Sequence, residues 1–149
     1  MPSVSRTFPV RPPPSQIVDY LKDFGNAEEW DPGTRECTRT DSGPIREGAA
    51  WHNVSNIFGV TTELTYTLDK LGEGELVFVG KNKSATSTEI INVKPGNTGS
   101  VITYRNDLAM HGLATLLSPV MKLAFEKLAN DTEKQMTHVL NGLQTKEQK

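Results

Sequence analysis

The chain has 149 residues, with 16 lysines and arginines against 18 acidic residues, and a single cysteine. A net charge of −2 excludes the basic surface typical of nucleic-acid-binding domains, and the lone Cys37 excludes an intrachain disulfide framework or a thiolate zinc cluster. Hydrophobic residues make up 36% of the chain, enough for one core, so we expect a single domain over residues 1–149. No apolar run has the length of a signal peptide or a membrane span. We therefore expect a cytoplasmic protein without stable membrane insertion.

The first third of the chain predicts one strand and two short helices. Alternating apolar residues up to Val10 indicate the strand. Three prolines at 12–14 suit a helix start, and apolar residues at helical spacing predict a helix over residues 15–24 that Gly25 ends. Asn26 is expected to cap a second short helix over 27–30, which Pro32-Gly33 ends.

From residue 34 to 111 the hydrophobic period changes to two, which predicts strands. Six are expected, separated by short turns rich in Gly, Asn, Asp and Pro: 34–41, 49–58, 61–71, 75–82, 84–94 and 99–111. Because the turns are short, each strand is expected to pair with the next as an antiparallel meander.

The last third predicts one long helix. Ser118-Pro119 is a typical helix start, and apolar residues recur every three or four positions up to Leu143. Such a helix over 118–143 is about 39 Å long, and residues 144–149 are expected to fray. Its apolar stripe needs a partner, and the concave side of the sheet is the available one. The prediction is an α+β fold with a small-molecule hollow between sheet and helix.

This order of elements resembles the START-like helix-grip superfamily, specifically its polyketide cyclase/dehydrase and lipid-transport branch. The residues that carry the resemblance are Pro12-Pro13-Pro14-Ser15, the run 19–24, Trp30, Gly48, the run 62–66, Thr103-Tyr104 and Ser118-Pro119. The resemblance implies a seven-stranded curved antiparallel sheet wrapped around a long C-terminal helix, with two short helices between the first two strands. The resemblance covers nearly the whole chain and predicts its fold. It does not predict a particular activity, because members of the superfamily include cyclases, lipid carriers and hormone receptors.

Few residues of the sequence are candidates for metal ligands or catalytic groups. His52, His111 and His138 have no metal-ligand spacing, so no metal or cofactor is expected. The carboxylates, Glu63 and Glu89 among them, are expected on solvated faces and turns. Aromatase/cyclases of the superfamily carry a Trp…Ser-x-Arg pattern whose Arg is thought to bind polyketide carbonyls. Here Trp51 and Ser55 match that pattern but Ile57 takes the Arg position, which weakens the cyclase interpretation.

Side-chain parity on the expected strands, together with the apolar stripe of the helix, predicts which residues line the hollow. Trp51 can equally be a plain core aromatic, and Tyr66 and Tyr104 can offer hydroxyl groups in an apolar wall. The predicted lining is Trp51, Ser55, Ile57, Leu64, Tyr66, Leu68, Phe78, Ile102, Tyr104, Leu108, Met121, Phe125, Leu128 and Met136.

Three functions stay open at this point. The favoured hypothesis is that the chain binds or transports a small hydrophobic ligand, such as a lipid, fatty acid or polyketide-like molecule, as a monomer or weak homodimer. The alternative is a polyketide cyclase/aromatase or dehydratase, with Tyr66, Tyr104, Ser55 and His52 as weak candidates for catalytic groups. The third is a regulatory or interaction protein.

Overall fold

The computed structural model describes residues 3–57, 59–110 and 119–147. Within these residues, seven strands and four helical segments follow one another. In order they are β1 (Ser3–Val10), α1 (Pro14–Leu21), the 3-10 turn η1 (Phe24–Asn26), α2 (Ala27–Trp30), β2 (Thr34–Arg39), β3 (Ala50–Ile57), β4 (Val60–Leu71), β5 (Glu75–Lys81), β6 (Ala85–Pro95), β7 (Ser100–Met110) and α3 (Pro119–Glu147).

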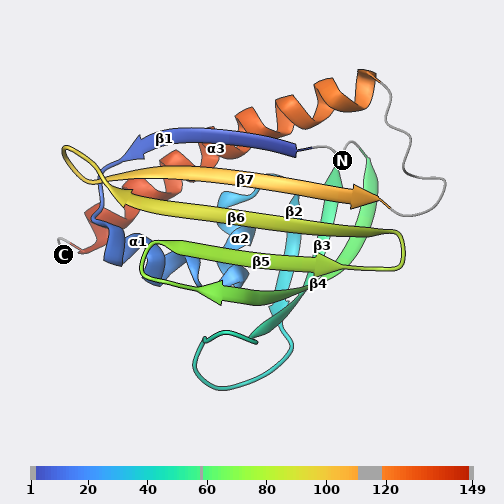
Figure 1. Ribbon diagram of the computed structural model, residues 1–149, viewed down its shortest axis with the longest axis horizontal. Coiled ribbons are helices and arrows are strands. Elements are labelled where there is room, and N and C mark those ends of the chain that lie inside the picture. Colours follow the sequence, from blue (N-terminus) through green and yellow to red (C-terminus); the bar gives the residue numbers. More distant parts are fainter. Residues whose placement is uncertain (1–2, 58, 111–118, 148–149) are drawn as a thin grey trace.

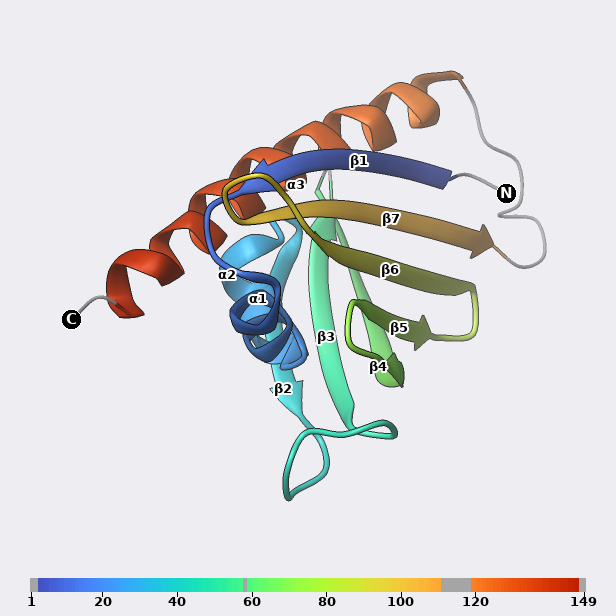
Figure 2. The same ribbon diagram turned by 60° about the vertical axis from the view of Figure 1, so that its left-hand side comes forward.

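The strands form one antiparallel sheet in the order β1-β7-β6-β5-β4-β3-β2. Strands β2 to β7 pair with their neighbours in sequence, which confirms the expected meander, and β1 completes the sheet against β7, from Ser3 opposite Asp107 to Val10 opposite Ser100. The sheet is curved, and α1, α2 and α3 all lie on its concave side (Figure 2). The long helix α3 packs against β1 and α2.

Aromatic side chains hold the short helical segments against the sheet. The ring of Phe24 lies 4.5 Å from the rings of both Tyr66 and Phe78 and 6.1 Å from that of Trp51, measured between centroids. The indole Nε1 of Trp51 donates to the Asp23 carboxylate at 3.2 Å, which satisfies its one polar atom inside the core. The expectation that Trp51 can be a core aromatic matches this environment.

Three helix termini differ from the sequence prediction. The first helix ends at Leu21 instead of residue 24, because Asp23 is extended and its carboxylate accepts a hydrogen bond from Gly25 N, which starts η1. Asn26 precedes α2, yet its amide donates to the Tyr20 carbonyl at 2.8 Å instead of capping the helix. At the other end, α3 continues through Glu147, past the predicted fraying point, over residues that favour helix.

Candidate functional site

The concave face of the sheet is packed at one end and open at the other. On β7, Ile102 and Tyr104 are buried, whereas Asn106, Leu108 and Met110 on the same face are half-buried. On β4, Leu68 and Tyr66 are buried and Leu64 is half-buried.

Strand β3 and helix α3 show the same gradient. Trp51 and Asn53 are buried but Ser55 is half-buried. On α3, Met136 and Leu140 are buried, whereas Phe125 and Leu128, about two to four turns earlier, are half-buried. We call the half-buried residues beyond Asn106 the open half of the concave face: Ser55, Leu64, Leu108, Met110, Phe125 and Leu128.

A polar band separates the packed end from the open half. It comprises Tyr66, Ser87, Glu89, Tyr104 and Asn106, which share the concave face of β4, β6 and β7. The Tyr104 hydroxyl donates to Glu89 Oε1 at 2.5 Å, and Asn106 Nδ2 donates to Ser87 Oγ at 2.9 Å. The Tyr66 ring lies over Gly80, where an added Cβ would come within 2.6 Å of the ring.

Glu89 is the acidic group of this band. Its side chain is 3% exposed, and its Oε2 is one of two buried side-chain polar atoms without a hydrogen-bond partner among the described residues, the other being Trp30 Nε1. Burial, with a smaller contribution from the charge of Asp31, raises the pKa of Glu89 from 4.5 to about 8, while hydrogen bonding by Tyr104 and Asn106 lowers it. Burial also raises the pKa of Tyr104 well above its usual range.

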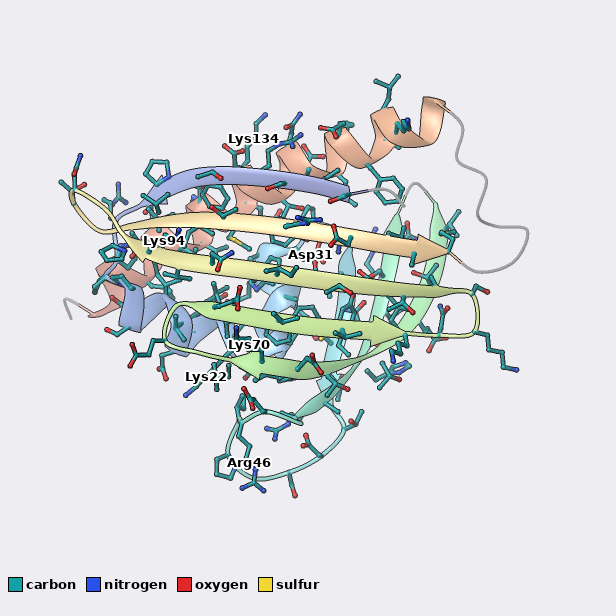
Figure 3. All side chains as sticks on the ribbon, viewed as in Figure 1. Lys22, Asp31, Arg46, Lys70, Lys94 and Lys134 are labelled. Atoms are coloured by element: carbon teal, nitrogen blue, oxygen red, sulfur yellow. The ribbon has the colours of Figure 1, made fainter. Side chains whose placement is uncertain are left out.

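A second polar chain runs beside the band, from β3 to the end of α2. Ser55 Oγ donates to Asn53 Oδ1 at 2.6 Å, Asn53 Nδ2 donates to Thr34 Oγ1 at 3.2 Å, and Thr34 Oγ1 donates to Asp31 at 2.9 Å. Burial raises the pKa of Asp31, although hydrogen bonds from Gly33 and Thr34 oppose the effect. Figure 3 shows Asp31 behind the middle of the sheet, whereas Lys22, Arg46 and Lys134 lie toward the periphery.

The neighbouring Cys37 is buried on the same side. Burial raises the pKa of its thiol to about 12, so at neutral pH it is a protonated, unreactive thiol. Cys37 is therefore a packing residue of the hydrophobic core.

The predicted lining residues fall into distinct groups. Five are fully buried in the packed end: Trp51, Leu68, Phe78, Ile102 and Met136. Ser55, Leu64, Leu108, Phe125 and Leu128 belong to the open half, and Tyr66 and Tyr104 to the polar band. The side chains of Ile57 and Met121, and all of His111, lie outside the described part of the structure.

The structure does not bring His52 to this face. Its ring Nε2 contacts Glu63 Oε1 at 2.7 Å on the convex side, opposite Trp51 and Asn53, because neighbouring residues of a strand point to opposite faces. As a candidate for a catalytic group beside Tyr66, Tyr104 and Ser55, His52 is therefore wrong.

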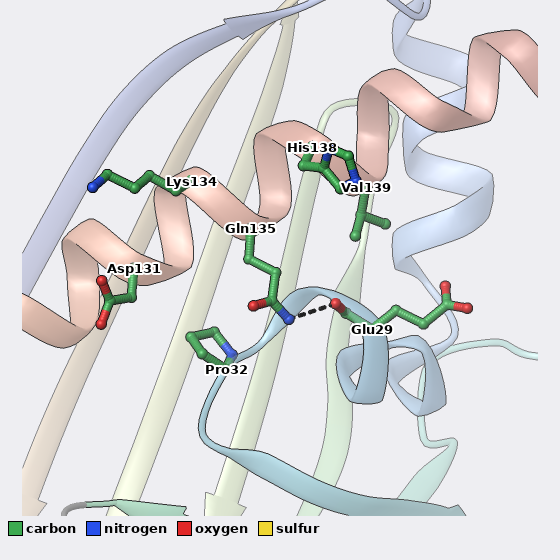
Figure 4. A pocket seen from close by; sticks show the side chains of 7 residues that line it. All are labelled: Glu29, Pro32, Asp131, Lys134, Gln135, His138 and Val139. Atoms are coloured by element: carbon green, nitrogen blue, oxygen red, sulfur yellow. Dashed lines mark hydrogen bonds between the residues drawn. The ribbon is translucent and has the colours of Figure 1, made fainter.

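Two surface hollows lie outside the concave face. The larger, of about 560 Å³, lies between α2 and α3 and is lined by Glu29, Pro32, Asp131, Lys134, Gln135, His138 and Val139. Gln135 Nε2 donates to the Glu29 carbonyl at 2.7 Å across it (Figure 4). The second, of about 450 Å³, lies beside α1 near Tyr20 and Ile45. Both are open to solvent, and neither contains a residue of the polar band.

Comparison with known proteins assigns the family. The sequence profile of the family described as polyketide cyclase/dehydrase and lipid transport matches residues 1–146. The chain belongs to this family. No curated protein matches its sequence.

Solved structures confirm the START-like helix-grip fold. A START superfamily protein from Mycobacterium smegmatis superposes with a TM-score of 0.78 at 13% identity, over 95% of this chain and 98% of that one. The Zhui aromatase/cyclase from Streptomyces sp. R1128 gives 0.71 at 13% identity, over 95% and 92%. Ginseng major latex-like protein 151 from Panax ginseng gives 0.69 at 8% identity, over 93% and 97%. At such identities the likeness shows the fold alone.

Two further observations concern metal binding and membrane spanning. Among the described residues, no group of three or more His, Cys, Asp or Glu side chains is arranged to bind a metal ion. Within the same part of the chain, no helix is both long and apolar enough to cross a membrane.

Sequence reasoning missed Glu89 as a site residue. The signal was present, because Glu89 shares its strand face with Ile91 and Val93, two apolar residues expected to point inward. The expectation that Glu89 lies on a solvated face or in a turn is therefore wrong.

Proposed function

We propose that this protein binds a small, mostly apolar molecule, of a lipid or polyketide-like kind, in the open half of the concave face between the sheet and α3. The observation that carries the proposal is the gradient of burial along β3, β4, β7 and α3. Apolar side chains on a concave face remain half-buried there, although the same face is fully packed a few residues away.

The chemistry of the open half suits such a ligand. Leu64, Leu108, Met110, Phe125 and Leu128 supply an apolar wall, and Met110 adds a flexible side chain that adapts to ligand shape. The polar band lies at the inner end of this wall and can orient one polar group of the ligand. A largely apolar surface with a few convergent polar groups is the usual composition of a small-molecule site.

The expected affinity follows from the buried area. Covering about 300 Å² of apolar ligand surface contributes up to about 7.5 kcal/mol at about 25 cal/mol per Å². Association and ordering cost about 4 kcal/mol or more, which leaves at most about 3.5 kcal/mol, so binding is expected to be millimolar or weaker for a ligand that buries this area.

Neighbouring residues of β4 provide a matched test. Leu64 points into the open half, and Thr65 is exposed on the convex face. Leu64→Trp is expected to fill the site and weaken binding of a fluorescent apolar probe at least tenfold, whereas Thr65→Trp leaves it unchanged. Equal affinities in the two variants, with both correctly folded by circular dichroism, would contradict the proposed site.

One observation favours an enzyme as the second candidate. Because the pKa of Glu89 is raised to about 8, its carboxyl can gain or lose a proton near neutral pH, and it is hydrogen-bonded to Tyr104. A cyclase or dehydratase acting on a poly-β-ketone needs such a proton-transfer group. If the wild type converts no such substrate, this candidate is excluded; if the wild type and a Glu89→Ala variant convert it at the same rate, the proton-transfer role of Glu89 is excluded.

A further inference from the structure

The two oxygens of the buried Glu89 carboxyl differ in their hydrogen bonding. Its Oε1 accepts from the Tyr104 hydroxyl at 2.5 Å, and its Oε2 has no hydrogen-bond partner among the residues that the structure describes. Glu89 lies opposite Asn106, the first half-buried residue of the concave row of β7, so Glu89 lies where the polar band meets the open half. A buried polar atom without a partner costs free energy, which a bound group can recover.

The surroundings of Glu89 favour its neutral form. The titratable groups that interact with it are Asp31 after α2, Cys37 on β2, Tyr66 on β4 and Tyr104 on β7. None of these is cationic, and the buried side chains of α3 do not titrate: Ala129, Thr132, Met136 and Leu140. Burial without a counter-ion raises the pKa of Glu89 to about 8, so the carboxyl keeps its proton at neutral pH.

A neutral Glu89 presents a donor to the ligand. With Oε1 occupied by the Tyr104 hydroxyl, the proton resides on Oε2, for which the described part of the chain supplies no acceptor. The other unpartnered buried atom, Trp30 Nε1, is also a donor, and the Trp30 ring packs edge-on against Tyr104 with 6.1 Å between centroids. Both unpartnered groups next to Tyr104 are therefore hydrogen-bond donors that can pair with an acceptor on a ligand.

We propose that the ligand of the concave face carries an uncharged carbonyl group, as in a ketone or ester, and that protonated Glu89 donates a hydrogen bond from Oε2 to the carbonyl oxygen. This inference rests on the proposed function, because it names the ligand class of the same site. It also implies that free carboxylic acids bind poorly. A carboxylate head would be desolvated beside two acidic side chains, Glu89 and Asp31, with no cation among the groups that act on Glu89.

The test compares three probes of equal chain length: 2-decanone, decanoate and 1-chlorodecane. Binding is followed by methyl NMR of Leu64 and Leu108, which line the open half. At pH 7 the wild type is expected to bind 2-decanone about threefold to tenfold more tightly than 1-chlorodecane, the range expected for one net hydrogen bond, and to bind decanoate more weakly than both.

Two variants isolate the role of Glu89. Glu89→Gln keeps an acceptor for Tyr104 and a donor for the ligand, and Glu89→Leu keeps neither. Between pH 7 and 9.5 the affinity for 2-decanone is expected to fall at least fivefold in the wild type and to stay constant in Glu89→Gln. In Glu89→Leu the preference for the ketone over the chloroalkane is lost. Glu73→Gln, which changes an exposed carboxylate in the turn after β4, is the charge control.

The outcomes separate the inference from the proposed function. If none of the probes shifts the Leu64 or Leu108 methyl signals, the proposed function fails. If ketone and chloroalkane bind equally well, or the ketone affinity of the wild type is independent of pH, the Glu89 inference is overturned while the binding function stands. If decanoate binds as tightly as 2-decanone, the predicted selection against carboxylic acids is wrong.

Discussion

Replacing Glu89 by Gln is predicted to change the pH dependence of folding stability. The pKa of Glu89 is raised from 4.5 to about 8 by burial, so between these values the unfolded chain releases a proton that the folded protein keeps. The contribution of Glu89 to stability is therefore greatest below pH 4.5 and falls as the pH rises to about 8. At about 1.4 kcal/mol per pKa unit, the whole interval corresponds to a loss of up to about 5 kcal/mol.

The assay is urea unfolding of the wild type and Glu89→Gln at a series of pH values from 4 to 9. The amide stays neutral, so the free energy of unfolding of the variant minus that of the wild type is expected to rise by about 1 kcal/mol per pH unit between about pH 5 and 8 and then to level off. The exposed Glu73→Gln variant is expected to track the wild type. A difference between Glu89→Gln and wild type that does not change with pH would refute the assignment of a neutral, buried carboxyl.

Further predictions concern other positions of the concave face. Gly80→Ala is expected to destabilise the fold by about 1–3 kcal/mol, measured by urea unfolding, because its methyl group meets the Tyr66 ring; unchanged stability contradicts that close approach. Cys37 is expected to react with a thiol reagent at pH 8 only after unfolding, because its pKa is about 12, and fast reaction of the native protein contradicts this. Tyr104→Phe is expected to raise the pKa of Glu89 further, because it removes a hydrogen bond that lowers it; carboxyl ¹³C NMR titration measures the change, and a lowered pKa contradicts the pairing.

The order of elements could be predicted from the sequence because each element has its own local pattern. Period-two hydrophobicity separated by turn residues gives the strands of the meander, and Pro119 followed by a stripe at helical spacing gives α3. Parity then places Tyr66 and Tyr104 on the concave face with Leu68 and Ile102. The helix ends were less predictable because they depend on particular hydrogen bonds, such as that from Gly25 N to the Asp23 carboxylate.

Local sequence patterns do not predict which part of the concave face is fully packed and which part is half-buried. Leu64 and Leu68 are the same residue type on the same face of one strand, yet only Leu68 is fully buried. What distinguishes them is which helical segment packs above, and that depends on sheet curvature and on the long-range contact of α3 with β1. The same holds for Glu89, whose environment is formed by Tyr104 from the next strand and Asp31 from the end of α2.

Xenon binding tests the central claim, an accessible apolar site in the open half, without knowledge of the natural ligand. Xenon enters apolar cavities and shifts the NMR signals of the methyl groups that line them. Under xenon pressure the methyl signals of Leu64, Leu108 and Met110 are expected to shift together with a saturable dependence, while those of the fully buried Leu68 and Leu76 stay unchanged. No shift at Leu64, Leu108 and Met110, or shifts spread evenly over all methyl groups, would contradict the account.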